Sequence, residues 1–209
     1  MIYVIIAFIF GVAIGVGVNR VSYRRNWGEA LVADAIERQF KRPHVLLNNV
    51  TLTVGNDTTQ IDHILVADTG IFVIETKHYA GWILGHTHDK QWTQVIYHTK
   101  SRFKNPVHQN YGHVKALMAL FNLPDEAFHS LVVFSGEAEL KTDLGLNVLR
   151  LHQLIPTLSA DRPILFDERK MAYVVGRIEM KRLRRSLDTD EYHLNSVRSR
   201  IQGKRRQSN

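Results

Sequence analysis

The stretch of sequence that decides the fold is residues 59–77, which read TQIDHILVADTGIFVIETK. Two segments rich in Ile, Val and Thr flank residues 68–70, Asp-Thr-Gly. β-Branched residues favour strands, whereas Asp and Gly favour the turn between them. The pattern therefore predicts an antiparallel hairpin with strands at residues 59–67 and 71–76. Because residues 71–74 are apolar on both faces, we expect the second strand to lie in the middle of a sheet.

Three ionisable residues fall where these two strands meet: Asp62 on the first, and Glu75 and Lys77 on the second. Residues two apart on a strand share a face, so Glu75 and Lys77 are expected to point the same way. With a three-residue loop between the strands, Asp62 is predicted to lie opposite Thr76. Two carboxylates and an ammonium at the end of a buried strand are costly unless they are paired or bind a metal ion. Carboxylates without soft ligands suit Mg²⁺ or Mn²⁺.

Two polar residues outside the hairpin are candidates for the same pocket. Residues 27–40 have the spacing of an amphipathic helix, and Glu29 falls on its apolar face, so its carboxylate is predicted to point inward. Asn105 followed by Pro106 predicts the start of another helix, with Asn as the cap and Pro in the first turn. Gln109 lies one turn into that helix, within reach of the same pocket.

The remaining periodicity completes an α/β pattern. The helix after Pro106 is expected to bury a face made of Val107, Tyr111, Val114, Met118 and Phe121. Further elements are predicted as strands at residues 45–54, 82–84, 91–97, 131–134 and 147–151, and as a helix at residues 168–187. Strands with helices before and after them indicate a mixed central sheet flanked by helices.

The N-terminal end of the chain has a different composition. Residues 2–18 are an uncharged apolar run, at the lower limit of about 17 residues for a helix that crosses a bilayer. Three arginines follow within the next seven residues. We expect residues 1–19 to form one transmembrane helix and residues 20–26 a basic juxtamembrane linker. The excess of arginine on the C-terminal side predicts a single-pass protein of the cell (inner) membrane with its body in the cytoplasm. A buried helix or strand of a soluble fold is the alternative.

The C-terminal end is basic. The chain carries a formal charge of +7, and ten of its 27 Lys and Arg residues lie in residues 177–209, beside four Asp and Glu. We expect residues 136–187 to complete the α/β body and residues 188–209 to form a basic helical or disordered tail. Such a tail can bind nucleic-acid phosphates or anionic lipid, or stay solvated without a partner.

Composition excludes several other classes of protein. The chain has no cysteine, which excludes a disulfide scaffold, a thiolate zinc site and a cysteine nucleophile. Its histidines are densest at His78, His86 and His88, but no carboxylate lies at ligand spacing around them, so a zinc site is not expected. The sequence also has no Gly-x-x-x-x-Gly-Lys loop for nucleotide phosphates.

Several short motifs, taken together, resemble the NERD (nuclease-related) domain, a branch of the PD-(D/E)xK restriction-endonuclease-like superfamily. Each motif alone is a weak signal, and their common order and spacing over residues 27–135 make the resemblance specific. One departure is His78, where the family often carries Asn. The matching pieces are Gly28-Glu29, Gln60-Ile61-Asp62-His63, Gly70 to Lys77, Gly81, Trp92 and Asn105-Pro106-x-x-Gln109.

The resemblance implies a restriction-endonuclease-like core and a metal-dependent active site. Asp62 and Glu75 would be ligands of Mg²⁺ or Mn²⁺, with the Thr76 carbonyl as a further ligand. Lys77 would be the catalytic lysine, and Glu29 and Gln109 accessory site residues.

Two functions are compatible with this pattern. The first is a membrane-anchored nuclease that hydrolyses phosphodiester bonds of nucleic acid, DNA rather than RNA. The second is a non-catalytic module that binds nucleic acid or serves as a membrane scaffold and keeps only the nuclease-like fold. A plain structural ion pair between Asp62 and Lys77, with Glu75 solvated at the strand end, is the simplest alternative for the cluster itself.

Overall fold

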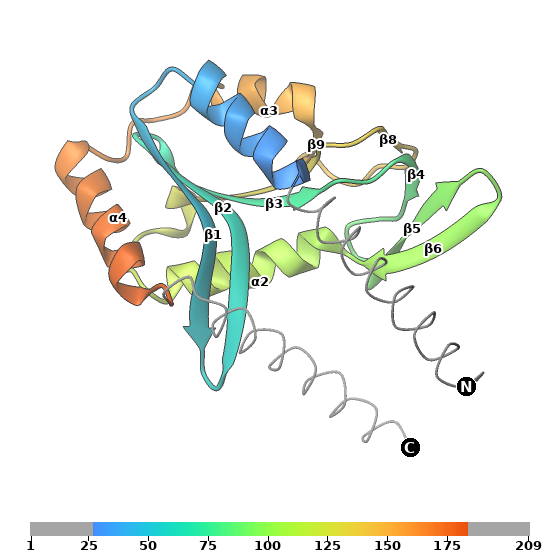
Figure 1. Ribbon diagram of the computed structural model, residues 1–209. Helices are drawn as coiled ribbons and strands as arrows, with labels where there is room; N and C mark the ends of the chain where they lie inside the picture. Colours follow the sequence, from blue (N-terminus) through green and yellow to red (C-terminus); the bar gives the residue numbers. More distant parts are fainter. Residues whose placement is uncertain (1–26, 184–209) are drawn as a thin grey trace, which may run out of the picture.

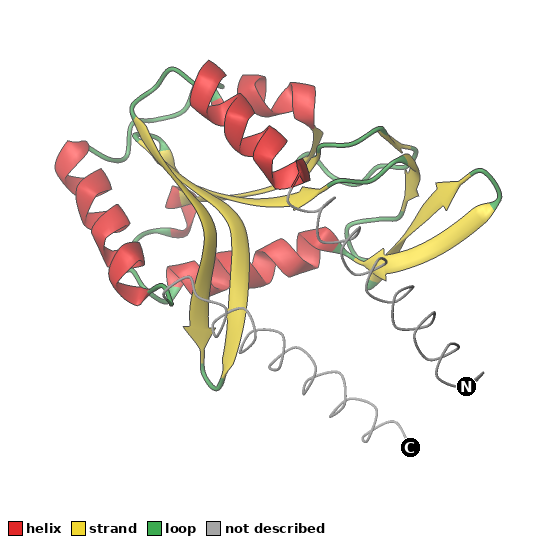
Figure 2. Ribbon diagram, in the orientation of Figure 1, coloured by secondary structure: helices red, strands yellow, loops and turns green. Residues whose placement is uncertain are grey.

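The computed structural model describes residues 27–183 of the 209-residue chain (Figures 1 and 2). The predicted transmembrane helix, the basic linker and residues 188–209 of the tail lie outside this range. No helix of the described residues is long and apolar enough to cross a membrane. After a helix over residues 27–39, the elements are β1 (His44–Val54), β2 (Asp57–Ala67), β3 (Gly70–Lys77), β4 (Gly81–Leu84), β5 (Gln91–Ile96), β6 (Thr99–Lys104), α2 (Pro106–Met118), η1 (Asp125–Ala127), β7 (Phe128–Phe134), β8 (Ala138–Leu140), β9 (Val148–Arg150), α3 (Leu151–Leu158) and α4 (Glu168–Lys181).

The main sheet is mixed, as the sequence predicts. Its strand order is β1-β2-β3-β7-β9, with antiparallel pairing from β1 to β3 and parallel pairing from β3 to β9. Strand β3 is therefore central, and residues 70–76 are buried on both faces. This placement confirms the prediction drawn from its continuous apolar run.

Helices cover both faces of this sheet (Figure 1). On one face, the helix over residues 27–39 and α3 pack on even-numbered residues of β3, such as Phe72 and Ile74. On the other face, α2 and α4 pack on odd-numbered residues, such as Ile71 and Val73. The alternation of a strand thus divides the core into two layers, and it places Glu75 and Lys77 on the α2 side.

A smaller sheet of order β6-β5-β4-β8 lies beyond the carboxyl end of β3. The core of this sheet includes Trp92, which is fully buried and donates its indole N–H to the His86 carbonyl at 2.8 Å. The sequence did not predict β6 or β8. Both are short strands in which charged or small residues outnumber the β-branched residues that mark a strand.

The register of the β2–β3 hairpin differs by one residue from the prediction. Ala67 pairs with Gly70 rather than with Ile71, so the connecting turn has two residues and Asp62 does not lie opposite Thr76. Gly70 adopts φ +130°, which lets the chain re-enter the sheet directly after the turn. A Cβ atom at this position would lie 2.7 Å from the Ala127 carbonyl oxygen.

The buried face of α2 and the length of one strand differ from the predictions. Helix α2 buries Asn110, His113 and Leu117 along with Val114, while Tyr111 is 59% exposed, because α2 turns a partly polar face to the sheet. The predicted strand at residues 147–151 is shorter, and α3 begins at Leu151. Short apolar runs do not distinguish strand from helix by periodicity.

The last helix matches its predicted start and ends earlier. Helix α4 begins at Glu168, with Asp167 accepting the Lys170 N–H at 2.7 Å, and ends at Lys181. Arg182 then forms a β-bridge with Leu52, and the extended backbone at that bridge stops the helix.

Candidate functional site

Strands β2 and β3 separate at Asp62. Their backbone pairing runs from Ala67 and Gly70 to His63 and Ile74. At the next position a side chain replaces the backbone acceptor: the Asp62 Oδ2 accepts the Thr76 N–H at 2.9 Å. The Asp62 side chain is buried, with 3% of its surface exposed. The Asp62 carboxylate therefore occupies the position where the β2–β3 backbone hydrogen bonds would otherwise continue.

A backbone distortion in β1 accompanies this separation. Asn49 lies between the paired residues Asn48 and Val50 and adopts φ +53°, a conformation that Asn tolerates better than most residues. Figure 1 shows the β1–β2 hairpin bending away from β3 and continuing beside α2. The bend brings the outer half of β2 against α2, where Thr59 meets His113.

The Glu75 carboxylate bonds to three side chains of the site. Its Oε1 accepts hydrogen bonds from Lys77 Nζ and, at 2.8 Å, from Gln109 Nε2. Its Oε2 lies 3.2 Å from His113 Nε2. Lys77 Nζ also approaches Gln109 Oε1 at 3.4 Å, so Glu75, Lys77 and Gln109 form one closed group between β3 and α2.

The partners of Glu75 decide its charge. Burial alone would raise the pKa of the Glu75 carboxyl, but the charge of Lys77, together with His113, lowers this pKa to about 2. Glu75 is therefore ionised throughout the physiological pH range. A buried carboxylate in this state depends on its partners, because losing one of them leaves an uncompensated charge.

Helix α2 is held in place by two buried asparagines. The Asn105 side chain caps the helix by accepting the Val107 N–H at 2.9 Å, which confirms the predicted cap. Its Nδ2 donates to the Thr87 and Asp89 carbonyls at 2.9 and 2.7 Å. Asn110 Nδ2 donates to backbone carbonyls of β3 and β7. These bonds fix the helix that carries Gln109 against the strand that carries Glu75.

Two contributors to this group, His113 and Thr59, were not among the site residues predicted from the sequence. His113 follows Gln109 by four residues, so both side chains leave the same face of α2. With its proton on Nε2, the His113 ring donates to Glu75, and its Nδ1 lies 2.8 Å from Thr59 Oγ1. The spacing of four from Gln109 was the available signal.

Glu29 is buried, with 6% of its surface exposed, which confirms that it points inward. The start of its helix packs tightly on the ends of β3 and β7, because a Cβ atom at Gly28 would lie 2.5 Å from His78 Cβ and 2.8 Å from Ser135 Oγ. The structure therefore joins Glu75, Lys77 and Gln109 directly and Asp62 through the Thr76 amide, and it places Glu29 on the helix packed against the end of β3.

The donor atoms available for a metal ion are oxygens. Among residues 27–183, no three or more His, Cys, Asp or Glu side chains form a group that could hold a metal. The predicted set has two carboxylates, Asp62 and Glu75, and one backbone carbonyl, that of Thr76. Such donors fit Mg²⁺ or Mn²⁺, but an ion would compete with Lys77 and His113 for Glu75.

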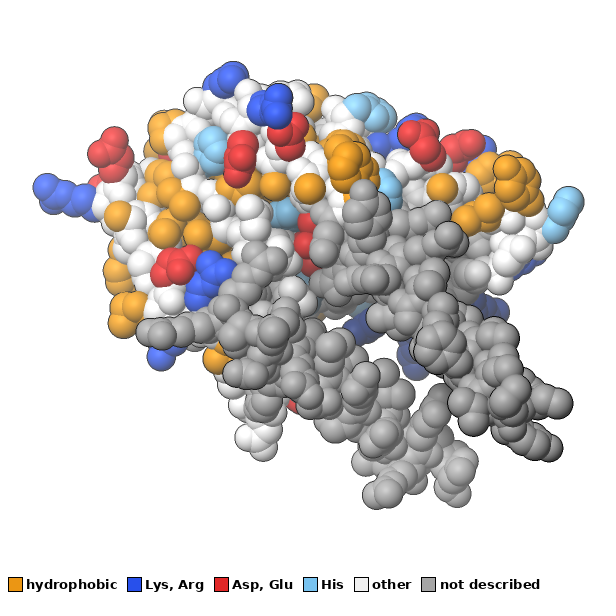
Figure 3. All heavy atoms as spheres, viewed as in Figure 1, with side chains coloured by type: hydrophobic (Ala, Val, Ile, Leu, Met, Phe, Trp, Pro, Cys, Tyr) orange, Lys and Arg blue, Asp and Glu red, His pale blue; other side chains and the backbone are white. Residues whose placement is uncertain are grey.

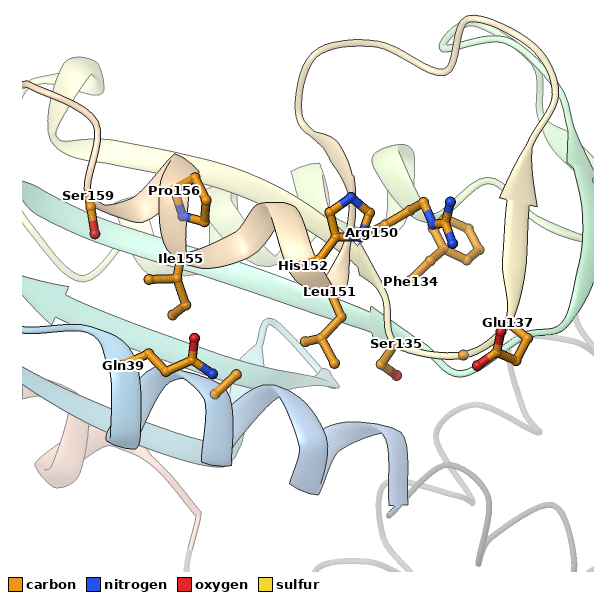
Figure 4. Close-up of a pocket in the computed structure, with 12 residues that line it drawn as sticks. Gln39, Phe134, Ser135, Glu137, Arg150, Leu151, His152, Ile155, Pro156 and Ser159 are labelled. Atoms are coloured by element: carbon orange, nitrogen blue, oxygen red, sulfur yellow. The ribbon is translucent and has the colours of Figure 1, made fainter.

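A cavity of about 830 Å³ lies on the opposite face of the sheet, between the helix over residues 27–39 and α3 (Figure 4). None of the predicted site residues lines this cavity. Gln39, Ser135, Arg150, His152 and Ser159 are among its polar lining residues. The Ser135 N–H donates to the Lys77 carbonyl at 3.1 Å, so the cavity and the Glu75 group meet at one backbone contact.

Comparisons with known proteins agree with the resemblance. The family model described as the nuclease-related domain, NERD, matches residues 24–135. An uncharacterised protein of Bacillus anthracis is 50% identical over 91 residues, which make up 43% of this chain and 43% of that protein. This chain therefore matches less than half the length of that relative. No solved structure matches the chain.

Proposed function

The chain belongs to the nuclease-related domain family, NERD, and from this premise we propose that it hydrolyses phosphodiester bonds of nucleic acid, with DNA preferred to RNA. A fold alone does not establish an activity, so the proposal depends on the site. The observation that carries it is the meeting of Asp62, Glu75, Lys77 and Gln109 at the point where β2 and β3 separate.

The proposed enzyme depends on Mg²⁺ or Mn²⁺, held by the carboxylates of Asp62 and Glu75 and by the Thr76 carbonyl. When bound, such an ion polarises the scissile phosphate and lowers the pKa of a water molecule that it binds. The low pKa of Glu75 supports the proposal, because the carboxylate is already deprotonated for a cation.

The other residues of the group act on charge and orientation. Lys77 Nζ neutralises negative charge that develops on the phosphoryl oxygens, and it is the cation that approaches a substrate at this site. Gln109 binds both Glu75 and Lys77, so it sets the position of the ammonium relative to the carboxylate. His113 holds the second oxygen of Glu75 from the helix side. Glu29 is an accessory acid on the neighbouring helix.

A nuclease assay on the full chain tests the proposal. Linear DNA and RNA are incubated with Mg²⁺, with Mn²⁺ and with a chelator, and the wild type is compared with Asp62→Asn. We expect cleavage only with metal, and a loss of at least about 100-fold in the variant. Asp161→Asn, which changes an exposed carboxylate, is the matched control and retains activity. A folded wild type that cuts neither substrate with either ion contradicts the proposal.

A non-catalytic binding or scaffold module is the second candidate. The bonding of Glu75 favours it, since Lys77, Gln109 and His113 already occupy both carboxylate oxygens without any metal. Calorimetric titration with Mg²⁺ separates the two functions. A nuclease is expected to bind Mg²⁺, and Asp62→Asn is expected to weaken that binding. A non-catalytic module, in which Lys77, Gln109 and His113 already pair with Glu75, is expected to give no Mg²⁺ binding.

The proposal extends to location. We assign residues 2–18 as a single membrane anchor, with the nuclease-related domain on the cytoplasmic side of the cell (inner) membrane. The support is the uncharged apolar run and the arginines that follow it. Carbonate extraction of membranes is expected to leave the full chain in the pellet. Release of the chain into the supernatant contradicts the anchor, and a C-terminal reporter active only outside the cytoplasm contradicts the orientation.

A further inference from the structure

Three cationic residues form a row along β6. Lys100, Arg102 and Lys104 alternate in sequence and all three are exposed. Because a strand has a period of two residues, they project from one face at intervals of about 7 Å. Phe103, between them, is half-buried and turns to the opposite face, where its ring meets Trp92 with centroids 6.2 Å apart.

The row has no acidic neighbours in its own hairpin. The residues that pair with the three cations across the ladder are Val95, Thr93 and Gln91, all uncharged. None of the ion pairs formed within residues 27–183 includes a cation of this row. Three like charges on one face, with no ion-pair partner among residues 27–183, make a surface that attracts a polyanion.

The hairpin that carries the row is firmly anchored. Trp92 on β5 is fully buried, and the Tyr79 ring packs edge-on against Phe103 with centroids 4.8 Å apart. The cations therefore extend from a rigid base, so they keep their spacing before a ligand arrives. A pre-organised surface loses less conformational entropy on binding than a flexible one.

The row also leads to the candidate active site. Strand β6 ends at Lys104, Asn105 caps α2, and Gln109, which binds Glu75, follows in the first turns of that helix. Figure 1 shows the β5–β6 hairpin projecting from the molecule beside the N-terminal end of α2. In Figure 3, Lys and Arg side chains gather along the lower side of this part of the molecule.

The tip of the hairpin presents an aromatic ring. Tyr97 is 94% exposed and adopts φ +53°, a conformation rarely seen for a bulky residue. Strained residues of this kind are maintained where the surrounding structure or a function requires them. An exposed ring next to a cationic row is the combination that binds single-stranded nucleic acid, where bases stack on aromatic rings and cations follow the backbone.

We propose that the β5–β6 hairpin is a binding arm for single-stranded nucleic acid. Lys100, Arg102 and Lys104 contact consecutive parts of the phosphate backbone, and Tyr97 stacks on an unpaired base at the far end of the row. The strand held in this way continues toward Glu75 and Lys77. This assignment rests on the proposed nuclease function for its substrate class, and it names a binding surface outside the candidate active site.

Binding is tested with the full chain and fluorescein-labelled (dT)20 in the presence of a chelator, so that no cleavage occurs. The variant Lys100→Gln/Arg102→Gln/Lys104→Gln is expected to bind at least 10-fold more weakly. The slope of log K against log salt concentration is expected to fall in magnitude by about 2, since each phosphate contact on a single strand contributes about 0.7. The control Lys41→Gln/Arg169→Gln/Lys181→Gln removes three exposed cations elsewhere and keeps the wild-type slope.

The aromatic contact is tested separately. Tyr97→Asn removes the ring and suits the left-handed backbone, and it is expected to weaken binding by about 5-fold or more. Tyr97→Phe retains the ring and wild-type affinity. Thermal melts of the cation variants and of Tyr97→Phe are expected to match the wild type, because the substituted side chains are exposed. Tyr97→Asn is expected to melt no lower than the wild type, because Asn suits the left-handed backbone.

Three results overturn the inference. The first is a wild type that does not bind (dT)20. The second is a triple variant with the wild-type affinity and salt slope. The third is a triple variant that binds (dT)20 as the wild type does but no longer binds vesicles containing phosphatidylserine. The last result assigns the row to a membrane surface. Failure of the inference and failure of the proposed function are distinguishable. If the triple variant keeps the wild-type salt slope while the wild type cleaves with metal, only the assignment of the hairpin is contradicted. If binding depends on the hairpin but no cleavage occurs, only the proposed nuclease activity is contradicted.

Discussion

At the scale of single residues, Lys77 separates a catalytic site from a structural ion pair. Its ammonium binds Glu75 and lies near Gln109, with 16% of its side chain exposed. Lys77 is therefore partly open to solvent, as Gln109 is, while Glu75 is almost fully covered. A cation in this place both compensates Glu75 and competes with any metal ion for the same oxygen.

Lys77→Met is expected to abolish cleavage without abolishing metal binding. Cleavage falls by about 10²- to 10⁴-fold, because a charge-stabilising group is lost. Mg²⁺ affinity, measured by calorimetry, rises, because the ammonium no longer competes for Glu75 Oε1. Lys141→Met is the matched control, since it breaks a solvent-exposed ion pair with Glu139, and such pairs contribute little to stability.

A structural ion pair gives the opposite pattern for Lys77→Met. The variant then loses about 3–5 kcal/mol of folding stability, because Glu75 keeps a buried charge without its strongest partner. Urea unfolding with and without Mg²⁺ distinguishes the outcomes. Destabilisation that Mg²⁺ does not reverse contradicts a metal site.

His63 is expected to make the folding stability of the protein fall in mild acid. Burial lowers the pKa of its imidazole from 6.5 to about 4, and the charge of Glu75 only partly opposes this shift. The unfolded chain therefore binds a proton at a higher pH than the folded chain does. Folding stability is complete above pH 6.5, declines as the pH falls toward 4, and loses about 3 kcal/mol over that range.

We expect His63→Leu to flatten this pH dependence. The leucine cannot take up a proton, so the free energy of unfolding between pH 7 and pH 4 changes less than in the wild type. His98→Leu, on the exposed hairpin turn, serves as the control and leaves the wild-type profile unchanged. An unaltered slope in His63→Leu would show that another group causes the acid sensitivity.

At the scale of elements, the start of α2 positions the site. Asn105 is fully buried and joins the helix to the loop before β5 through one accepted and several donated hydrogen bonds. A substitution there affects Gln109 and His113 together, because both lie on the helix that Asn105 begins. The site thus depends on a residue that does not touch Glu75.

Asn105→Ala is expected to cost about 2–4 kcal/mol in urea unfolding. The loss combines a helix cap, worth about 1 kcal/mol, with buried carbonyls left without donors. Asp167→Ala is the matched control, because Asp167 caps α4 at an exposed position and should cost only about 1 kcal/mol. Equal costs for the two variants would contradict a buried tether at Asn105.

At the scale of the whole molecule, the proposed metal ion would link the site to global stability. A ligand that binds only the folded state stabilises it by about 2.7 kcal/mol when its free concentration is 100 times its Kd. Mg²⁺ is therefore expected to raise the melting temperature of the wild type, and sodium chloride at equal ionic strength is not. Asp62→Asn should lose the shift. A wild-type melting temperature that does not change when Mg²⁺ or Mn²⁺ is added contradicts the metal site.

Predictions from sequence succeeded where neighbouring residues carry the information. The β2–β3 hairpin, the central position of β3, the cap at Asn105 and the shared face of Glu75 and Lys77 all follow from strand periodicity and turn chemistry. These signals act over a few residues, so they are present in the chain before it folds. The buried position of Glu29 and the place of Gln109 one turn into α2 follow from the same local signals, whereas their roles in a site stay predictions.

The tertiary structure decided the features that depend on distant packing. The hairpin register differs by one residue because Gly70 fits closely against Ala127 on the way to β7. The polar face of α2 turns inward because Asn110 and His113 find partners on the sheet. The bonding of Glu75 to His113, and of His113 to Thr59, joins residues far apart in sequence. Such contacts form only once the two layers of the core have packed, since burial makes each unpaired polar group costly and so selects the arrangement that pairs them.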